Sequence, residues 1–212
     1  MLGESGSGKT ASLRNFEEAD VSILNVASKP LPFRNKNKLK MANKATYSMI
    51  KGAVASGRTP SYVIDDAQYL MAFESFDKVN ETGYTKFTTM AKNYEEMLRH
   101  IQEETDPNVI VYVLQHIDKD EDGKIKAKTL GKMLDQQLTV EGLFSIVLLA
   151  QTDGKRHWFV TQSDGTNPCK SPMGMFEEVE IDNDLKMVDD TIREYYELSK
   201  ETPKKKKQNK EN

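Results

Sequence analysis

The sequence predicts an α/β domain in which a mostly parallel sheet is covered by helices on both faces. Apolar runs of strand length alternate along the chain with segments of helical spacing, and this alternation is typical of such folds. The run at residues 109–114 (VIVYVL) is almost entirely apolar, as expected of a strand buried on both faces. A glycine-rich stretch, GESGSGKT at residues 3–10, adds the expectation of a phosphate-binding loop.

The elements follow in order along the chain. We predict strands at residues 21–26, 61–65, 109–114, 143–150 and 157–161, the last antiparallel to its predecessor. Helices are predicted at residues 11–16, 46–54, 84–101 and 184–198, where apolar residues recur on one face. The glycine-rich loop begins at residue 3, so the strand that normally feeds such a loop is expected to be absent or truncated, as a late start site or an incomplete chain would explain.

Composition and charge describe one intracellular domain. The chain has 212 residues and a formal net charge of -3, a balance that neither requires nor excludes a nucleic-acid partner. The single cysteine, Cys169, precludes an intramolecular disulfide and fits a reducing compartment. Neither a membrane span nor a signal peptide is expected. We therefore predict a cytoplasmic ATP-binding domain at residues 1–200, followed by a disordered lysine-rich tail at residues 201–212.

The stretch at residues 3–10 matches the pattern G-x-x-x-x-G-K-[ST]. Its glycines let backbone N–H groups surround the phosphates, and the helix that follows points its positive end at the same anion. Lys9 is expected to reach the β and γ phosphates, and Thr10 to ligate Mg²⁺. The predicted nucleotide-binding residues are Gly3, Glu4, Ser5, Gly6, Ser7, Gly8, Lys9 and Thr10. A glycine-rich turn that merely caps a helix is the structural alternative.

Two aspartates end the strand predicted at residues 61–65. In α/β folds ligands bind at the carboxyl ends of parallel strands, so Asp65 is the candidate to hold Mg²⁺ through water. Asp66 is the candidate to position the attacking water. Either aspartate could instead cap the helix that follows, and for Asp66 that alternative is equally open.

Gln115 and His116 follow the strand predicted at residues 109–114 in the same manner. A polar side chain there can contact the γ-phosphate and report its hydrolysis to the rest of the molecule. Both side chains could equally face water at the sheet edge, and nothing in the sequence ranks one above the other.

Two further patterns bear on the ligand. A guanine-reading N-K-x-D motif is absent from the sequence, so ATP is preferred over GTP. The string that begins at Asp118 resembles the opening of an EF-hand loop, but its twelfth position is Thr129, where a glutamate is required. A hairpin that turns at Asp122 and Gly123 explains the string better than a calcium site.

Together these segments resemble phage-encoded RecA-like ATPases, often described as AAA-family ATP-binding proteins. The residues that carry the resemblance are GESGSGKT, YVIDD, VYVLQH, KTLGKMLD at residues 128–135 and KSPMGMF at residues 170–176. The group is similar to phage single-strand annealing proteins of the Sak type, which have a shortened RecA core. The resemblance runs from Gly3 to about Tyr196.

The resemblance implies a RecA-type core, ATP binding and a role in phage DNA recombination, annealing or replication. In RecA-like relatives a basic residue late in the domain can enter the ATP site of a neighbouring subunit, and Lys170 lies in the matching region. An ordinary surface lysine is the alternative for Lys170. Relatives also carry a catalytic glutamate after the strand that follows the P-loop helix. Here residues 27–29 are Ala-Ser-Lys, so hydrolysis is less certain than binding unless Asp66 substitutes.

Contact with single-stranded DNA is suggested by the basic segment at residues 34–44 and by the lysine tail, which could neutralise phosphates. Phe33 and Tyr47, at the edges of that segment, could stack on bases. A solvated loop is the alternative.

Two other functions remain open: a non-hydrolysing, ATP-dependent module that recruits replication proteins, and a small-molecule kinase. The scarcity of arginines between residues 60 and 190 argues against a kinase.

Overall fold

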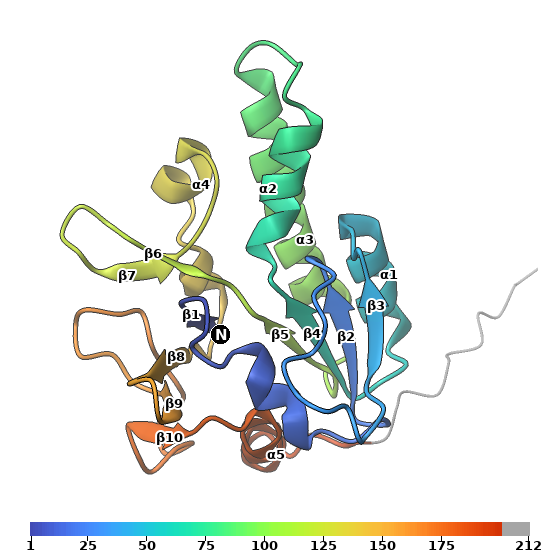
Figure 1. The fold of residues 1–212 in the computed structure, drawn as a ribbon, viewed down its shortest axis with the longest axis vertical. Coiled ribbons are helices and arrows are strands. Elements are labelled where there is room, and N and C mark those ends of the chain that lie inside the picture. Colours follow the sequence, from blue (N-terminus) through green and yellow to red (C-terminus); the bar gives the residue numbers. More distant parts are fainter. Residues whose placement is uncertain (201–212) are drawn as a thin grey trace, which may run out of the picture.

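A computed structural model describes residues 1–200, apart from the side chains of residues 132, 135 and 136. It has a mixed α/β architecture with parallel sheets and helices, as predicted (Figure 1). The lysine-rich segment 201–212, predicted to be a disordered tail, lies outside the described residues. None of the helices in the described part combines the length and the apolar character needed to cross a membrane.

One four-stranded sheet is parallel and has the strand order β3 (Lys40–Asn43), β2 (Val21–Asn25), β4 (Ser61–Asp65) and β5 (Ile110–Val113). β2 pairs with β4 from Val21↔Ser61 to Asn25↔Asp65, so the two strands end at the same level. The strands predicted at residues 21–26, 61–65 and 109–114 are confirmed. Their carboxyl ends form one edge of the sheet, where α/β folds bind ligands.

A second four-stranded sheet contains β1 (Leu2–Gly3), β8 (Leu149–Thr152), β9 (His157–Val160) and β10 (Glu180–Asp182). β1 pairs parallel to β8, whereas β9 is antiparallel to both β8 and β10. A parallel bridge between Leu2 and Gln115 joins the two sheets. The strands therefore form a single row in the order β3-β2-β4-β5-β1-β8-β9-β10, and β5 lies between the aspartate-bearing strand and the loop-bearing strand.

The predicted strand at residues 143–150 is only partly correct. β8 begins at Leu149, and Val140–Leu143 forms a 3-10 helix, η2. Val147 makes an isolated antiparallel bridge to Lys170 instead of joining a longer strand. The apolar run is long because its residues fill the core, not because all of it is extended.

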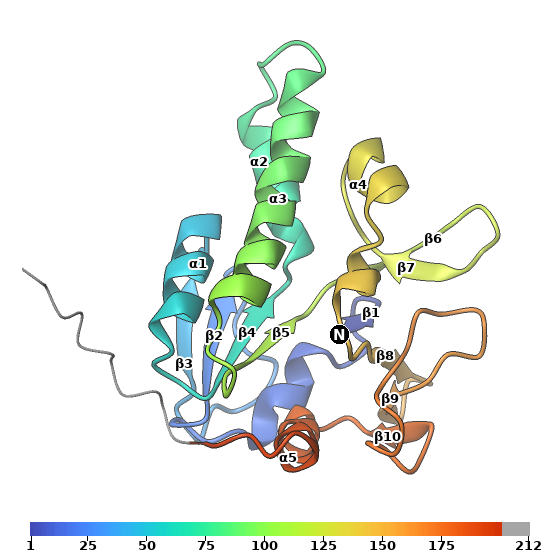
Figure 2. The ribbon, with the colours of Figure 1, turned by 180° about the vertical axis from the view of Figure 1, so that it is seen from behind.

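Helices cover both faces of the sheet (Figures 1 and 2). On one face lie α1 (Tyr47–Ser56), α2 (Gln68–Asp77) and α3 (Thr85–Glu104), and on the other lie the 3-10 helix η1 (Thr10–Asn15) and α5 (Leu185–Tyr195). The remaining elements are the strand pair β6 (Ile117–Lys119) and β7 (Ile125–Ala127) and the short helix α4 (Lys132–Gln137). The helices predicted at residues 46–54, 84–101 and 184–198 are confirmed, while the one predicted at residues 11–16 is the 3-10 helix η1.

Local capping explains where two of these helices begin. The Thr46 side chain accepts a hydrogen bond from the N–H of Met49 at the start of α1, and the helix ends at Gly57 with a φ of 55°. The Asp184 carboxylate accepts from the N–H groups of Lys186 and Met187 at the start of α5. These caps fix the helix ends against the sheet.

The alternation of side chains along β2 divides the interior into two apolar cores. Val21 and Ile23 point to the core shared with η1 and α5. Leu24 and Val26 point to the core shared with α1, α2 and α3. Since a strand presents successive side chains to opposite faces, one short run of apolar residues holds both helical layers in place.

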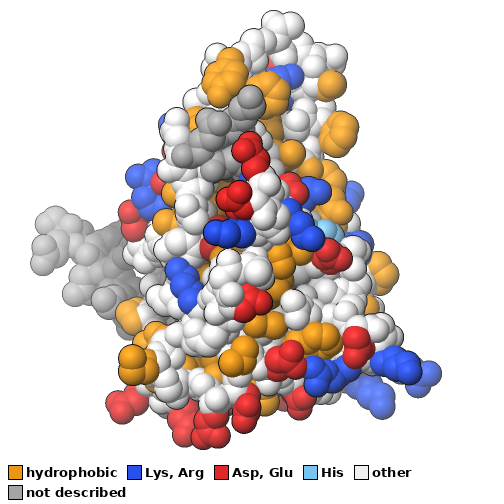
Figure 3. Space-filling model, turned by 90° about the vertical axis from the view of Figure 1, so that its left-hand side faces the viewer, with side chains coloured by type: hydrophobic (Ala, Val, Ile, Leu, Met, Phe, Trp, Pro, Cys, Tyr) orange, Lys and Arg blue, Asp and Glu red, His pale blue; other side chains and the backbone are white. Residues whose placement is uncertain are grey.

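The surface around β10 is acidic. In the side view of Figure 3, charges of both signs are mixed over the face, and acidic side chains gather along its lower edge, at the level of β10 in Figure 1. The exposed acids of this region are Glu177, Glu178, Glu180 and Asp182.

Candidate functional site

The loop of residues 3–10 joins β1 to η1, and its backbone requires glycine at three positions. Gly6 and Gly8 have φ angles of 80° and 97°, in the left-handed region that other residues rarely adopt. A Cβ on Gly3 would lie 2.5 Å from Ser7 Oγ and 2.8 Å from the carbonyl oxygen of Ala150. The loop is therefore a tight turn that packs directly against β8.

Several backbone donors of this loop have no acceptor in the protein. Within residues 1–200, the N–H groups of Gly6, Gly8 and Lys9 make no hydrogen bond to a protein atom. Ser12 N–H, by contrast, bonds the carbonyl of Gly8 at 3.0 Å and starts the helical turn. Unsatisfied N–H groups that converge in a tight loop are suited to bind an anion such as a phosphate.

Lys9 is buried at the centre of the loop, with 6% of its surface exposed. Its ammonium donates hydrogen bonds to the carbonyl oxygens of Gly3 and Glu4, both at 2.8 Å. Burial lowers the pKa of Lys9 to about 8, although Asp66 and Asp65 nearby act in the opposite direction. An ammonium has three donors, so one N–H of Lys9 is still available to an anion in front of the loop.

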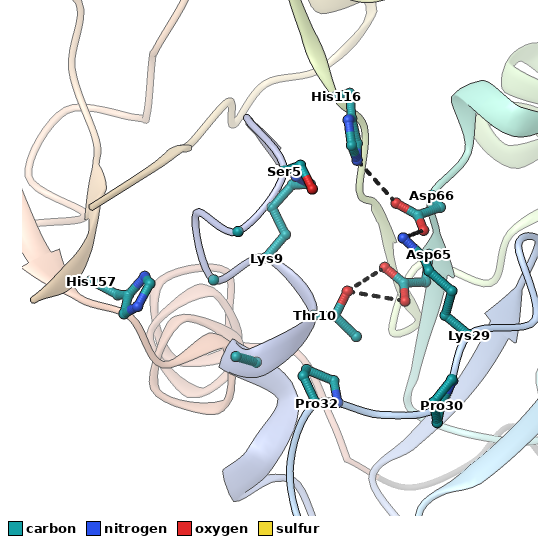
Figure 4. A pocket seen from close by; sticks show the side chains of 13 residues that line it. Ser5, Lys9, Thr10, Lys29, Pro30, Pro32, Asp65, Asp66, His116 and His157 are labelled. Atoms are coloured by element: carbon teal, nitrogen blue, oxygen red, sulfur yellow. Dashed lines mark hydrogen bonds and ion pairs between the residues drawn. The ribbon is translucent and has the colours of Figure 1, made fainter. Parts of the chain in front are cut away.

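Thr10 contacts Asp65 across the gap between the loop and β4. The Thr10 hydroxyl lies 2.9 Å from Asp65 Oδ1 and 3.1 Å from Oδ2 (Figure 4). Burial, and secondarily the neighbouring Asp66, raise the pKa of Asp65 to about 6, while the Thr10 hydrogen bond lowers it. A hydroxyl and a carboxylate side by side are oxygen ligands of the kind Mg²⁺ prefers together with phosphates. The residues present therefore fit a magnesium ion.

Asp66 follows directly after β4 and is also buried, with 2% of its surface exposed. Its backbone has a φ of 61°, which turns its carboxylate towards β5 and the loop after β2. Asp66 Oδ2 forms an ion pair with Lys29 Nζ at 2.5 Å, and Oδ1 lies 3.4 Å from His116 Nε2. Burial, and then the positive charge of Lys9, lower the pKa of His116, so this histidine is neutral at pH 7.

These side chains surround one cavity of about 310 Å³, shown in Figure 4. The loop forms one wall, the ends of β4 and β5 form the opposite wall, and the chain after β2 closes the side. The lining residues are Ser5, Gly6, Gly8, Lys9, Thr10, Ala11, Lys29, Pro30, Pro32, Asp65, Asp66, His116 and His157. Most of the predicted site residues are thus brought together from separate parts of the chain.

Gln115 is a predicted site residue that does not reach the cavity. It is 1% exposed, and its amide oxygen accepts a hydrogen bond from Tyr94 Oη at 2.6 Å. Its amide nitrogen donates to the carbonyl of Lys128 at 2.5 Å. The side chain therefore joins α3 to the segment after β7, and at this strand end His116 is the residue that lines the cavity.

Lys170 also lies outside the cavity of its own chain. Its backbone exchanges hydrogen bonds with Val147, at 2.8 and 3.0 Å, in the bridge that precedes β8. The role predicted for Lys170 is in the ATP site of a neighbouring subunit, and it stays a prediction.

Sequence reasoning missed five lining residues: Ala11, Lys29, Pro30, Pro32 and His157. His157 Nδ1 lies 3.1 Å from the carbonyl oxygen of Ser7, so it donates to the glycine-rich loop from the start of β9. Lys29 occupies the segment where RecA-like relatives are expected to carry a glutamate. The sequence signal was the position of Lys29 just beyond a predicted strand, at the level of Asp65.

The two aromatic residues predicted to stack on bases are packed against the interior. Phe33 packs on the core that includes η1 and α5, and Tyr47 packs on the core that includes α1 and α3. The basic side chains between them are exposed: Arg34, Lys36, Lys38, Lys40 and Lys44. The segment offers positive charge, but in this conformation it presents neither aromatic ring freely.

The hairpin predicted around Asp122 and Gly123 is confirmed. β6 and β7 pair antiparallel, and Gly123 has a φ of 79° in the turn between them. The Asp120 carboxylate accepts hydrogen bonds from the N–H groups of Asp122 and Lys124, at 3.0 and 2.8 Å. This aspartate serves the turn itself.

The geometry of the cavity is the basis for assigning a function. No protein-family model matches the chain, and a search of curated proteins finds no match either.

Proposed function

We propose that this chain is an ATP-binding protein of the phage RecA-like type, which binds Mg-ATP between the glycine-rich loop and Asp65. The observation that carries the proposal is the contact of Thr10 Oγ1 with Asp65, at 2.9 and 3.1 Å, between residues 55 positions apart. A glycine-rich turn that only capped a helix would need no buried carboxylate opposite it. The order of the parallel strands supports a RecA-like core, since it aligns the carboxyl ends of β1, β5 and β4 around one cavity.

Each residue then has a defined task. The N–H groups of Gly6, Gly8 and Lys9 cradle the phosphates, and the Lys9 ammonium reaches the β and γ phosphates. Thr10 and Asp65 hold Mg²⁺, whose charge stabilises the negative charge on the phosphate oxygens. The cavity of about 310 Å³ lies at the lower end of the range for small-ligand sites and suits the triphosphate rather than the whole nucleotide.

Hydrolysis would depend on Asp66 and His116. Among the described residues that line the cavity, the carboxylates are Asp65 and Asp66. With Asp65 assigned to Mg²⁺, Asp66 is the candidate to orient the attacking water. His116, held beside Asp66 at 3.4 Å, can accept or donate a hydrogen bond at the same point. The proposed reaction is Mg-dependent hydrolysis of ATP.

The proposed partner is single-stranded DNA, in recombination, annealing or replication. The exposed lysines and Arg34 of the segment 34–44 support this, since they offer positive charge on the outer edge of the sheet, away from the acidic surface at β10. Binding there would be independent of base sequence and would weaken steeply as salt is raised.

A non-hydrolysing, ATP-dependent interaction module is the second candidate. The observation that favours it is the engagement of Asp66 by Lys29 and His116, which leaves that carboxylate committed to protein partners. Such a module would use ATP to change its surface and recruit other replication proteins.

One experiment separates the two candidates. ATP hydrolysis is measured at low salt with and without single-stranded DNA, with Lys9→Ala as the blank, and ATP affinity is measured by calorimetry. Turnover that rises with DNA would identify a DNA-dependent ATPase. Binding without turnover would identify the interaction module. If the wild-type protein binds no nucleotide in the presence of Mg²⁺, both candidates fail.

A further inference from the structure

Lys29 is the cation that the sequence analysis did not foresee at this site. Its ammonium lies in an ion pair 2.5 Å from Asp66 Oδ2, and it faces the cavity from the side closed by the chain after β2 (Figure 4). The two partners differ in exposure, since the Lys29 side chain is 56% exposed and that of Asp66 only 3%. The carboxylate is fixed in the interior, whereas the lysine head group borders the open cavity.

The backbone around Lys29 is held in place although its head group is not enclosed. The amide of Asn25, at the end of β2, donates a hydrogen bond to the carbonyl oxygen of Lys29 at 2.7 Å. Val26 N–H bonds the carbonyl of Asp65 at 3.2 Å, which ties the same segment to β4. Ser28 has a φ of 57°, so the chain turns sharply just before Lys29. This anchoring directs the side chain across the end of β4.

The position of Lys29 relative to the magnesium ligands decides which phosphate it would meet. Thr10 and Asp65 would hold a magnesium ion, which would supply positive charge beside the outer phosphates of ATP. Asp66 follows Asp65, so the Lys29–Asp66 pair lies beside Asp65, across the cavity from the loop. A terminal phosphate in the cavity would therefore face the Lys29 ammonium, while ADP would leave it without a phosphate to contact.

We propose that Lys29 leaves Asp66 and binds the terminal phosphate of ATP instead. The Lys29–Asp66 ion pair is then present with ADP and broken with ATP. The proposal rests on the proposed function, since it requires nucleotide in this cavity. When Lys29 moves to the phosphate, the Asp66 carboxylate is free to accept a hydrogen bond from water beside the γ-phosphate. The same movement transmits the nucleotide state to residues 28–43, the segment that carries the exposed basic side chains.

The test compares two affinities in one protein. Dissociation constants for Mg-ADP and for a non-hydrolysable Mg-ATP analogue are measured by calorimetry for the wild type and for Lys29→Met. Lys36→Met is the matched control, because Lys36 is an exposed lysine of the same segment and does not line the cavity. Loss of a charged contact with phosphate should weaken binding of the ATP analogue by about 10- to 100-fold. Binding of Mg-ADP should change by less than about 2-fold, and the control should alter neither.

A second variant tests the exchange from the other side. Asp66→Asn removes the charge that competes for Lys29, so it should tighten binding of the ATP analogue relative to ADP. If Lys29 served only to neutralise buried Asp66, Lys29→Met would lower the melting temperature and leave the ratio of the two affinities unchanged. That result, or an unchanged ratio in Asp66→Asn, would overturn the proposal. Failure of the proposed function would look different, since the wild type would then bind neither nucleotide.

Discussion

A buried aspartate with its hydrogen-bond and ion-pair partners lies at each end of β4. The two networks differ in whether the cation that pairs with the aspartate is itself buried. At the amino end, Asp189 of α5 accepts hydrogen bonds from Ser61 Oγ at 2.5 Å and Tyr112 Oη at 3.0 Å, and pairs with Arg193 Nε at 2.8 Å. At the carboxyl end, Asp66 pairs with Lys29 and lies beside His116. Both aspartates are 2% exposed, so burial alone does not distinguish them.

The cations make the difference. Arg193 is 4% exposed, and its remaining donors bond the carbonyls of Pro60, Asn108 and Ser199 at 2.7 to 3.2 Å. The Lys29 side chain is 56% exposed and borders a cavity. A buried carboxylate stabilises the fold when the other hydrogen-bond donors of its cation are also bonded within the protein. When the cation instead faces open space, it can leave the carboxylate and contact a ligand. The same kind of ion pair is thus enclosed by the protein at one end of the strand and borders an open cavity at the other.

The largest effect is expected at the closed network. Asp189→Ala leaves Arg193 buried without its counter-charge and should lower the free energy of unfolding by about 3–5 kcal/mol. Urea denaturation measures this, with Asp190→Asn as the control, because Asp190 lies on the same helix with a side chain 46% exposed. The control should lose less than about 1 kcal/mol. An equal loss in both variants would mean that the network is not closed as described.

Loss of the loop lysine should affect ligand binding instead of folding. Lys9→Ala removes the ammonium expected to contact the β and γ phosphates and should weaken Mg-ATP binding by about 100-fold or more. The melting temperature without nucleotide should fall little, because burial already lowers the pKa of Lys9 to about 8 and makes its charge costly. Calorimetry and thermal unfolding together measure both effects. Unchanged ATP affinity would contradict the assignment of this loop.

An intermediate effect on the free energy of unfolding is expected from pH, through Asp65 at the carboxyl end of β4. The pKa of Asp65 is raised from 3.8 to about 6, so the folded protein binds this proton more tightly than the unfolded chain. Without nucleotide and Mg²⁺, Asp65 should therefore contribute about 1 kcal/mol more stability at pH 5 than at pH 7.5, and the gain should be lost as pH rises through 6. Comparison with Asp65→Asn isolates this contribution. The variant should show a smaller difference in unfolding free energy between the two pH values; an identical difference would refute the assignment.

The smallest effect is expected from an exposed ion pair. Arg156 and Glu180 pair at 2.5 Å, but their side chains are 61% and 49% exposed. Glu180→Gln should change the free energy of unfolding by no more than about 0.5–1 kcal/mol, in either direction. A larger loss in urea denaturation would show that distance, and not closure by the protein, determines what an ion pair contributes here.

The same contrast explains what could be predicted from sequence. The loop of residues 3–10 and the strand ending in Asp65 were found because each is encoded by neighbouring residues: glycines where φ is positive, and an apolar run followed by an acid. Helix α1 was found through its apolar face, and the structure adds the Thr46 cap at its start. Helix α2 was missed because it exposes Phe73 and Phe76 and so lacks a clear polar face.

The missing parts depend on contacts between distant segments. Whether Gln115 faces the cavity is decided by Tyr94 from α3 and by the carbonyl of Lys128, and neither can be inferred from the strand that precedes Gln115. Lys29 reaches Asp66 only because β2 and β4 end at the same level in the sheet. Strand 143–150 was placed too early because burial makes a run apolar whether or not it is extended.

The shortness of β1 affects how the protein unfolds locally. Leu2 and Gly3 are paired with β8, and the bridge from Leu2 to Gln115, together with the hydrogen bonds of Met1 to Val113 and Gln115, links the two sheets. The glycine-rich loop begins at this seam, so a ligand that ordered the loop would also stabilise the contact between the two sheets. Hydrogen exchange should therefore show two cooperative units, with β8 and β9 opening separately from β2 and β4 in the free protein. With nucleotide bound, we expect the two units to exchange as a single cooperative unit, because the ligand would stabilise the contact between the two sheets.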